Sequence, residues 1–234
     1  MILFSIPIIG YDKELINDYK NLLKHLKSEY PQKYDSCINP GLKKIHKLLW
    51  GLYITEKTFN EKDIYFSDIF TNTLSYINIL LLKDKKILEF LERSSIENFI
   101  KFSKLFFHDL NTLNAPRDIF SHIFSNCNSI EFVHKRYKLI KSKYSEISWS
   151  LHGNNIDSTK TAKQLKQCAN RYSTKELLQS TDNYYQLIIN FLEIYYYYNY
   201  NLLEKLIDNE QYILKDMLSK EWLSEIKEKI IESW

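Results

Sequence analysis

The sequence predicts an all-α protein, a multi-helix bundle with long antiparallel helices. Only 4 glycines and 4 prolines occur among its 234 residues, well below the average usage of roughly 7% and 5%. A chain with so few turn-forming residues favours long helices over many short strands. Apolar residues also recur at intervals of three and four, which is the period of one helix face. The 18 tyrosines and 13 phenylalanines supply side chains large enough to fill a thick helical core.

Two helices are expected in the first 60 residues. The first follows Asp12 and extends to about Tyr30, with Pro31 just beyond its end. Asn39 and Pro40 have the residue types of an N-cap and a first helical position. The apolar side of this second helix consists of Leu42, Ile45, Leu48, Leu49 and Leu52.

The next two segments are also predicted to be helical. One helix runs from about Asp63 to Leu82, and the charged run Lys83–Lys86 then makes a break or a solvated turn. The segment Ile87–Leu110 is either one helix or two helices that meet at Ser94.

The clearest helix pattern lies between Asn128 and His152. Asn128 and Glu131 resemble a capping box at its start, and Gly153 is a typical residue after a helix end. Apolar residues between them alternate spacings of three and four without interruption: Ile130, Val133, Tyr137, Ile140, Tyr144, Ile147 and Leu151. This stripe predicts a helix with one face in the core.

The remainder of the chain predicts more helices and no linker. We expect them from about Ser158 to Arg171, from about Thr174 to Asp208, and as a final pair or one bent helix up to Trp234. No Gly/Ser-rich or Pro-rich stretch divides the sequence. The expected organisation is an N-terminal helical segment, residues 1–60, packed on a bundle formed by residues 61–234, or else one single domain, since the boundary near Asn60 is weakly marked.

Composition and charge limit the function classes. The net charge of +3 permits an acidic partner without predicting one, because nucleic-acid binders are usually more basic. Cys37, Cys127 and Cys168 lie far apart and form no metal-ligand spacing, so we expect reduced thiols and neither a metal nor a cofactor. The most apolar runs are shorter than the ~18 residues of a spanning helix. The N-terminus also lacks the basic region of a signal peptide. We expect a cytoplasmic protein without a membrane segment.

Arg117 and His122 form the first set of residues that could carry chemistry. On a helix that starts at Pro116, five positions correspond to roughly 500°, so the two side chains would lie about 140° apart around the axis. They could converge only if Arg117 lies in the loop before the helix, or if two copies of the chain meet in a dimer. The structural alternative is a pair of ordinary residues in the first turns of a helix.

The second set consists of Arg93, Glu97 and His152. Arg93 and Glu97 are an i,i+4 pair if the helix is continuous there, and His152 ends the next long helix, where carbonyl groups favour a protonated imidazole. Ser145 and Ser148 precede His152 on its own helix, and hydroxyl groups with an arginine could bind a phosphate. In the structural alternative, Glu97 belongs to a capping box at a helix start and His152 is a C-terminal capping cation.

At these residues the sequence resembles a known superfamily. The stretches "ERSSIENFIKF" (Glu92–Phe102) and "YSEISWSLHG" (Tyr144–Gly153) are similar to two helix motifs of the HEPN-like superfamily, the higher eukaryotes and prokaryotes nucleotide-binding helical domains. The resemblance covers about Asp63 to Asp208. It implies a bundle of about four to five helices that often dimerises.

The resemblance also implies an activity. Active HEPN-like proteins are metal-independent ribonucleases of toxin–antitoxin, abortive-infection and CRISPR-associated systems, and they carry an arginine followed several residues later by a histidine. Arg117 and His122 match that spacing, but the histidine of the family closes a long helix, as His152 does here. No arginine stands at the matching spacing before His152. The site is therefore Arg117 with His122, or His152 with an arginine from elsewhere, or catalysis has been lost. The position in the helix favours His152.

Such a ribonuclease would use the chemistry of these side chains alone. A neutral imidazole takes the proton from a ribose 2′-OH, which attacks the adjacent phosphate, and the arginine stabilises the charge on the phosphorane oxygens. RNA contacts would come from the basic residues of this helix, Lys135, Arg136, Lys138, Lys141 and Lys143, together with Ser145 and Ser148. Of these, Lys135, Lys138 and Lys141 are spaced by three and lie off the apolar stripe. The alternative is a plain solvated lysine face.

The stretch Ile194–Leu203, which contains the tyrosine run Tyr195–Tyr198, is the most biased composition in the chain. Adjacent residues on a helix point all round it, so some of these rings face the core and others face solvent or a partner. The run predicts a dimer or partner surface or, equally, an aromatic seam within the core.

Together these observations predict a cytoplasmic HEPN-like protein of a prokaryotic anti-phage defence or toxin–antitoxin system that cleaves or binds RNA without a metal. The alternative is a non-catalytic helical module that recognises a protein partner, as a sensor, scaffold or antitoxin subunit. A homodimer or a protein partner from the same system is expected in either case.

Overall fold

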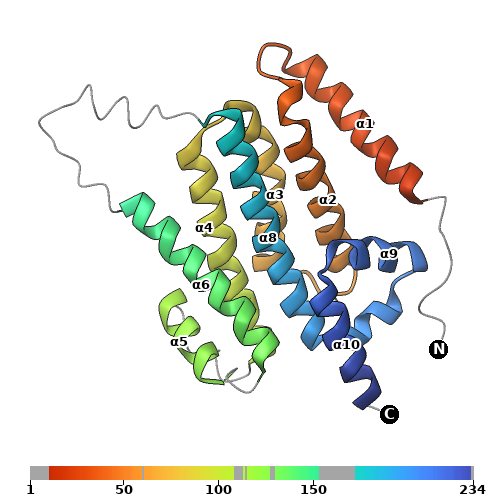
Figure 1. Ribbon diagram of the computed structural model, residues 1–234, viewed down its shortest axis with the longest axis vertical. Helices are drawn as coiled ribbons and strands as arrows, with labels where there is room; N and C mark the ends of the chain where they lie inside the picture. The colour runs from red at the N-terminus through yellow and green to blue at the C-terminus, as the bar shows by residue number, and fades with distance from the viewer. Residues whose placement is uncertain are drawn as a thin grey trace, which may run out of the picture.

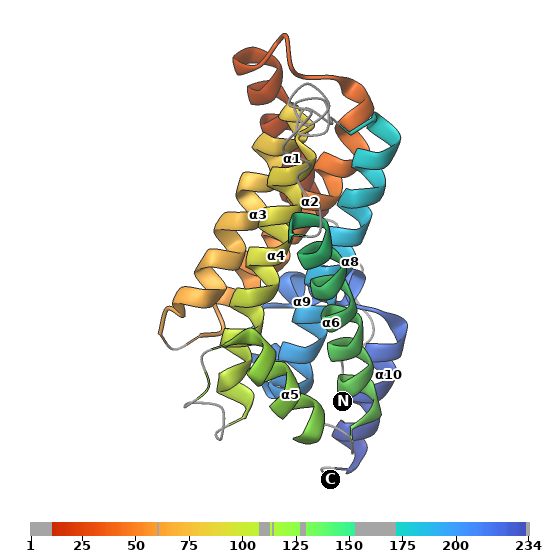
Figure 2. The same cartoon turned by 90° about the vertical axis from the view of Figure 1, so that its left-hand side faces the viewer.

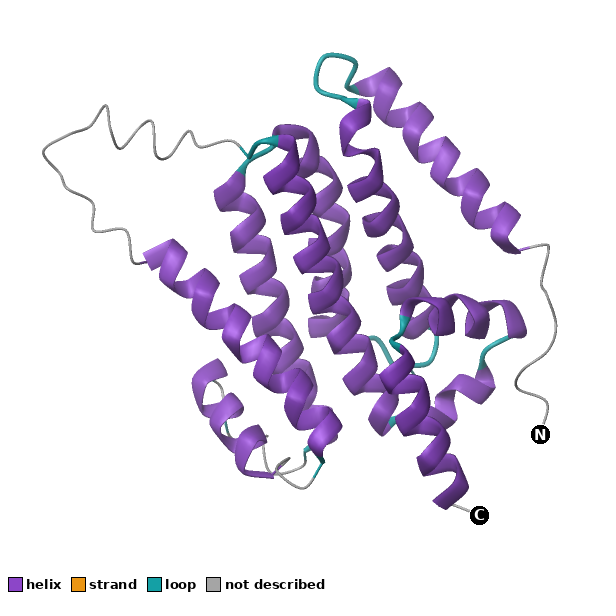
Figure 3. Cartoon of the chain, in the orientation of Figure 1, coloured by secondary structure: helices purple, strands orange, loops and turns teal. Residues whose placement is uncertain are grey.

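The computed structural model describes residues 11–59, 61–107, 113, 115–126, 130–152 and 172–232. Within these ranges the regular structure consists of α-helices and short 3-10 helices, with no strand (Figure 3). The predicted all-α class is therefore confirmed. None of the described helices is long and apolar enough to cross a lipid bilayer.

Helices α1 (Tyr11–Glu29) and α2 (Asn39–Glu56) match the first two predicted segments. The predicted N-cap is wrong by one position, because Asn39 is already helical and Ile38 stands at the cap. A 3-10 helix, Ser36–Ile38, leads directly into α2, which leaves no extended residue there for a side-chain cap. The Asn39 amide oxygen instead accepts a hydrogen bond from the Tyr34 hydroxyl at 2.6 Å.

Helices α3 (Ile64–Leu82) and α4 (Lys85–Phe102) are joined by a two-residue turn and pack side by side (Figures 1 and 2). Lys83 ends α3 in the left-handed conformation, with φ 54°. Asp84 then caps α4, since its carboxylate accepts from the Ile87 N–H at 3.1 Å. The predicted break is therefore confirmed at Lys83 and Asp84, whereas Lys85 and Lys86 already belong to α4.

Helix α4 continues through Ser94, so the two-helix alternative for this segment is wrong. The apolar stripe explains the continuity, because Leu88, Leu91, Ile96 and Phe99 are all buried on the same side. Helix α4 stops at Phe102 and is followed by a 3-10 helix, Ser103–Phe106.

The second half of the chain contains α5 (Pro116–Asn126), α6 (Glu131–His152), α8 (Thr174–Tyr198), α9 (Asp208–Met217) and α10 (Lys220–Glu232). The predicted helix from about Ser158 to Arg171, the capping residue Asn128 and the helix-ending Gly153 lie outside the described residues.

Helix α8 is shorter than predicted, because it ends at Tyr198 instead of near Asp208. Asn199 ends it: both the backbone N–H and the side-chain amide of Asn199 donate to the Tyr195 carbonyl, each at 3.0 Å. A 3-10 helix, Tyr200–Lys205, follows.

Helix α8 runs through the middle of the bundle and packs against α2, α4, α6 and α10 (Figure 1). Tyr195, Tyr196 and Tyr197 are 5%, 0% and 8% exposed, and Tyr198 packs against the core. The aromatic-seam interpretation of the tyrosine run is therefore correct. The dimer-surface hypothesis is wrong for Tyr195–Tyr197, since their side chains are covered by the same chain.

Candidate functional site

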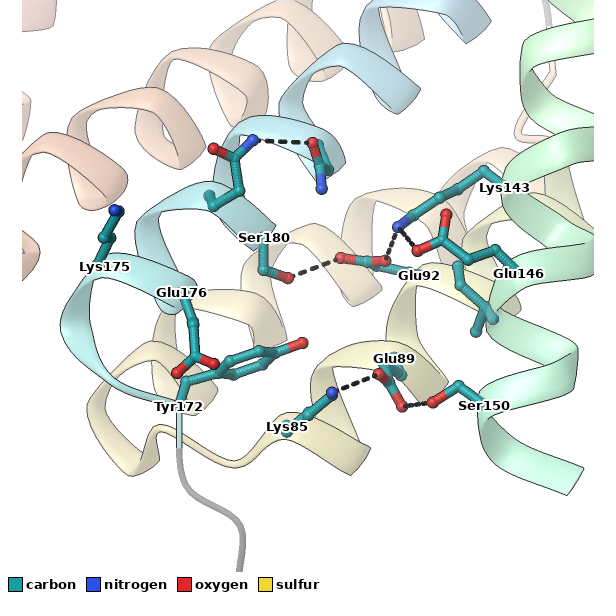
Figure 4. Close-up of a pocket in the computed structure, with 13 residues that line it drawn as sticks. Lys85, Glu89, Glu92, Lys143, Glu146, Ser150, Tyr172, Lys175, Glu176 and Ser180 are labelled. Atoms are coloured by element: carbon teal, nitrogen blue, oxygen red, sulfur yellow. Dashed lines mark hydrogen bonds and ion pairs between the residues drawn. The ribbon is translucent and has the colours of Figure 1, made fainter. Parts of the chain in front are cut away.

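A cleft of about 470 Å³ opens between α4, α6 and the start of α8 (Figure 4). Each helix supplies charged groups. The charged lining of the cleft consists of four glutamates and three lysines: Glu89, Glu92, Glu146, Glu176, Lys85, Lys143 and Lys175. A cleft that gathers ionisable groups from three helices is a candidate ligand-binding site.

Glu92 forms the floor of this cleft. It is only 2% exposed, because its position on α4 falls on the apolar stripe between Leu88 and Ile96. Its Oε1 accepts a hydrogen bond from the Ser180 hydroxyl of α8 at 3.1 Å, and its Oε2 lies 3.8 Å from the Lys143 ammonium of α6. Burial raises the pKa of Glu92 to about 7, although Lys143 and the Ser180 hydrogen bond both lower it.

A buried network of hydroxyl groups lies behind Glu92. The Ser180 hydroxyl is also 3.3 Å from the Tyr76 hydroxyl of α3, and the ring of Tyr76 stacks on that of Tyr184, with centroids 4.4 Å apart. The Tyr184 hydroxyl in turn contacts those of Thr73 and Ser95, at 2.9 and 3.1 Å. This network fixes Ser180, and with it one oxygen of Glu92, because a buried polar group keeps its hydrogen-bond partners.

The rim of the cleft is held by side-chain pairs between helices. The Ser150 hydroxyl of α6 donates to Glu89 of α4 at 2.9 Å, while Lys143 also contacts Glu146 at 3.3 Å. Glu176 has a structural role, because its carboxylate accepts from the backbone N–H and hydroxyl of Ser173 in the capping box of α8.

The chemistry open to this cleft is proton transfer and the binding of hydrogen-bond donors or cations. A carboxyl group with a pKa near 7 can both accept and donate a proton at neutral pH. Within the described residues, no group of three or more His, Cys, Asp or Glu side chains could hold a metal ion.

The predicted pair Arg93 and Glu97 lies at the α4–α6 contact. Arg93 Nε is 2.9 Å from Glu97 Oε1, and the Tyr144 hydroxyl of α6 donates to the same oxygen at 3.0 Å. The guanidinium group lies over the Tyr144 ring, 5.6 Å from its centroid. The i,i+4 pair is therefore formed. The capping-box alternative for Glu97 is wrong, since α4 has no start there.

The three polar residues predicted as site residues near the end of α6, His152, Ser145 and Ser148, differ in how they are placed. His152 is its last residue, and the side chain of His152 lies outside the described part of the structure. Ser145 is exposed. The Ser148 hydroxyl is buried and has no hydrogen-bond partner among the described residues.

Arg117 and His122 both lie within α5, so Arg117 is not in the preceding loop. The five-residue separation on a helix turns their side chains about 140° apart, so the two do not converge within one chain. They could form a site only if two copies of the chain meet in a dimer. His122 Nε2 instead lies 2.7 Å from the Asn126 amide, one turn further along α5.

The basic side chains of α6 divide into two groups. Lys135 pairs with Glu221 of α10 at 2.8 Å, whereas Lys138 and Lys141 are exposed, with the Lys141 ammonium 4.7 Å from the Phe124 ring centroid. Trp149 shares the solvent side of α6 and is 78% exposed.

The sequence analysis did not single out the buried carboxylate of Glu92 or the exposed indole of Trp149. A signal for Glu92 was present, because Leu88, Glu92 and Ile96 are spaced by four and place a carboxylate on a core-facing stripe. Trp149 lies two positions after the stripe residue Ile147, which places it off the core-facing side.

No family model, curated protein or solved structure matches this chain. The HEPN-like resemblance therefore depends on the α4 and α6 residues quoted above.

Proposed function

We propose that this chain is a cytoplasmic HEPN-like RNA-binding protein of a prokaryotic defence or toxin–antitoxin system, and that RNA binds along the solvent side of α6. The observation that carries this proposal is the exposed Trp149, 78% accessible to solvent, on the same side of α6 as Lys138 and Lys141. In this interpretation α3, α4, α6 and α8 are the long antiparallel helices of a HEPN-like core.

The positions on α6 support a continuous binding strip. Lys138, Lys141, Ser145 and Trp149 follow one another at spacings of three and four, so they lie along one side of the helix. That side is opposite the buried Ile140. An exposed indole can stack on any base, and lysines attract the phosphates of a single strand.

A second candidate function is metal-independent RNA cleavage, favoured by the position of Arg93. Arg93 contacts Tyr144, and Tyr144 lies two turns before His152 on α6. An arginine of α4 and a histidine of α6 would then supply phosphate stabilisation and a general base.

Fluorescence anisotropy with a labelled single-stranded RNA tests the binding proposal. Trp149→Ala should weaken binding by about tenfold, since stacking of one base contributes about 1–3 kcal/mol. The double variant Lys138→Ala/Lys141→Ala should make binding less dependent on salt, because fewer counterions are released when two lysines no longer neutralise phosphates. The matched control is Lys20→Ala/Lys24→Ala, two exposed lysines of α1, which should leave binding unchanged.

The same RNA, incubated with the protein in EDTA, tests cleavage. If the protein is a nuclease, we expect products with 2′,3′-cyclic phosphate ends, and these products should disappear in Arg93→Ala and His152→Ala. If the products disappear in Arg117→Ala and His122→Ala instead, the site lies on α5. Binding without cleavage identifies a non-catalytic RNA-binding protein. If wild type and all variants fail to bind RNA, the proposal is wrong and the protein-interaction alternative is favoured.

A further inference from the structure

We propose that the cleft between α4, α6 and α8 binds a small organic cation, with an amine or guanidinium group of the ligand paired to the buried carboxylate of Glu92. Arg93 does not line this cleft, and the inference does not depend on the proposed RNA-binding function.

One oxygen of Glu92 is available to such a ligand. Oε1 is taken by Ser180, but Oε2 has only Lys143, at 3.8 Å. That separation exceeds the ~2.7–3.2 Å of an N–H···O hydrogen bond. Within the described part of the chain, Oε2 therefore has an ion-pair neighbour and no hydrogen-bond donor, and it faces the cleft (Figure 4).

The position of Lys143 indicates that the Glu92 carboxylate at the floor of the cleft attracts a cation. Its ammonium group reaches toward Glu92 from α6 and also contacts Glu146 at 3.3 Å. A cation of this chain thus already occupies the approach to Glu92. A ligand amine can bind closer to Oε2 while Lys143 remains with Glu146, which is 72% exposed at the rim.

The walls are also suited to a cation, and a second cationic group could be held there. Glu89 lies one turn before Glu92 on α4. Its carboxylate accepts from Ser150 and already has the Lys85 ammonium as an ion-pair neighbour at 3.7 Å. The Tyr172 ring on the α8 side already has the Lys85 ammonium 5.6 Å from its centroid. An anion would meet the buried carboxylate at the floor, where charges interact more strongly than at the hydrated rim.

Binding of a cation should depend on pH, because it requires ionised Glu92. The ionisable groups that face Glu92 from the surrounding elements are Lys143 and Glu146 of α6, Tyr76 of α3, Tyr184 and Tyr172 on the α8 side, and Glu89 of α4 itself. With a pKa of about 7, the ionised fraction rises roughly tenfold between about pH 6 and pH 8, and the apparent affinity rises by the same factor. An aliphatic amine stays protonated over this range.

Isothermal titration calorimetry of the full chain with spermidine and with putrescine, in EDTA and without RNA, tests this inference. Wild type should bind about tenfold more tightly at pH 8 than at pH 6. Glu92→Gln should lose binding by tenfold or more and lose the pH dependence, because the amide keeps the Ser180 contact without the charge. Lys143→Gln should shift the rise in affinity to higher pH, because the Lys143 ammonium lowers the pKa of Glu92.

Glu204→Gln is the matched control, because Glu204 is an exposed glutamate of the 3-10 helix that follows α8. It should bind like wild type, as should Trp149→Ala, which separates this result from the RNA surface. The inference is overturned if wild type shows no binding up to about 1 mM ligand, or if Glu92→Gln binds as well as wild type. Should Glu92→Gln fail to fold by circular dichroism, an unchanged pH dependence of binding in Lys143→Gln would overturn it.

Discussion

Burial of Glu92 links the stability of this protein to pH. Its pKa is raised from 4.5 to about 7, mainly by burial, so the folded state retains a proton that the unfolded state has released between these values. Stability must therefore fall as the pH rises. The favourable contribution is complete below about pH 4.5 and is lost as the pH rises through about 7, with a total near 3 kcal/mol at 1.36 kcal/mol per pKa unit.

Glu92→Gln should remove this pH dependence, because glutamine resembles the protonated acid. At pH 8 we expect the variant to be more stable than wild type by about 2–3 kcal/mol, and near pH 5 the two should be similar. Urea unfolding at both pH values measures this difference. A wild-type advantage at pH 8 would contradict the raised pKa, and Glu204→Gln should not change the comparison.

At the scale of elements, Arg136 joins three helices. Its guanidinium group lies 2.8 Å from Glu193 of α8 and 2.8 Å from Glu221 of α10, and it is 4% exposed. Glu193 is 1% exposed, and its second oxygen accepts from the Ser219 N–H at 2.8 Å. Arg136 is therefore a structural link of α6 and is turned away from any nucleic-acid surface.

Arg136→Met should destabilise the fold by about 3–5 kcal/mol, because Glu193 would remain as an unpaired buried charge. Equilibrium urea unfolding measures the loss, and Arg136→Met/Glu193→Gln should recover part of it. The neighbouring Lys135→Ala is the control. It breaks an exposed pair with the same Glu221 and should cost at most about 1 kcal/mol. Equal effects of the two single variants would be inconsistent with this account.

Elements with a repeated apolar pattern could be predicted from the sequence, and the cleft could not. In the predicted α6 stripe Val133, Tyr137, Ile140 and Ile147 are buried, and Ile130 and Tyr144 are partly buried against the core, because one helix face is a local property. The contact of Glu92 with Ser180, 88 positions later, depends on how α4 and α8 pack. Spacing along one helix contains no information about it.

The difference between local patterns and tertiary contacts also explains which helix ends could be predicted. Asp63 and Asp84 are local caps at the starts of α3 and α4. The end of α8 at Tyr198 depends on hydrogen bonds of Asn199, in a stretch whose apolar pattern continues beyond it. The sites at Arg93 and Glu97 were predictable as an i,i+4 pair, but their shared contact with Tyr144 is tertiary.

At the scale of the whole molecule, α2 belongs to the central core. It packs against α3, α8 and α9, and five of its side chains are at most 1% exposed: Leu42, Ile45, Leu48, Leu52 and Ile54. Burial of each contributes about 1.5–3 kcal/mol, and their sum is comparable to the roughly 5–15 kcal/mol that stabilises an entire protein.

A fragment of residues 61–234 should therefore not fold cooperatively, whereas the full chain should unfold in one transition. Thermal and urea unfolding, followed by circular dichroism and tryptophan fluorescence, compare the two. A fragment without α1, starting just before Asp35, is the control, because Ser36–Ile38 and α2 remain; it should still unfold cooperatively. A cooperative, native-like 61–234 fragment would instead favour two domains with a boundary near Asn60.

The turn at Lys83 also bears on the order in which the molecule is assembled during folding. Helices α3 and α4 meet across only two residues, so closing this hairpin costs little chain entropy and can occur early. The carbonyl of Lys83 accepts the backbone N–H of Tyr172 at 3.0 Å, immediately before α8. A contact between neighbours in sequence thus creates the acceptor for a segment 89 positions later, and we expect the central helix to dock after the hairpin has formed.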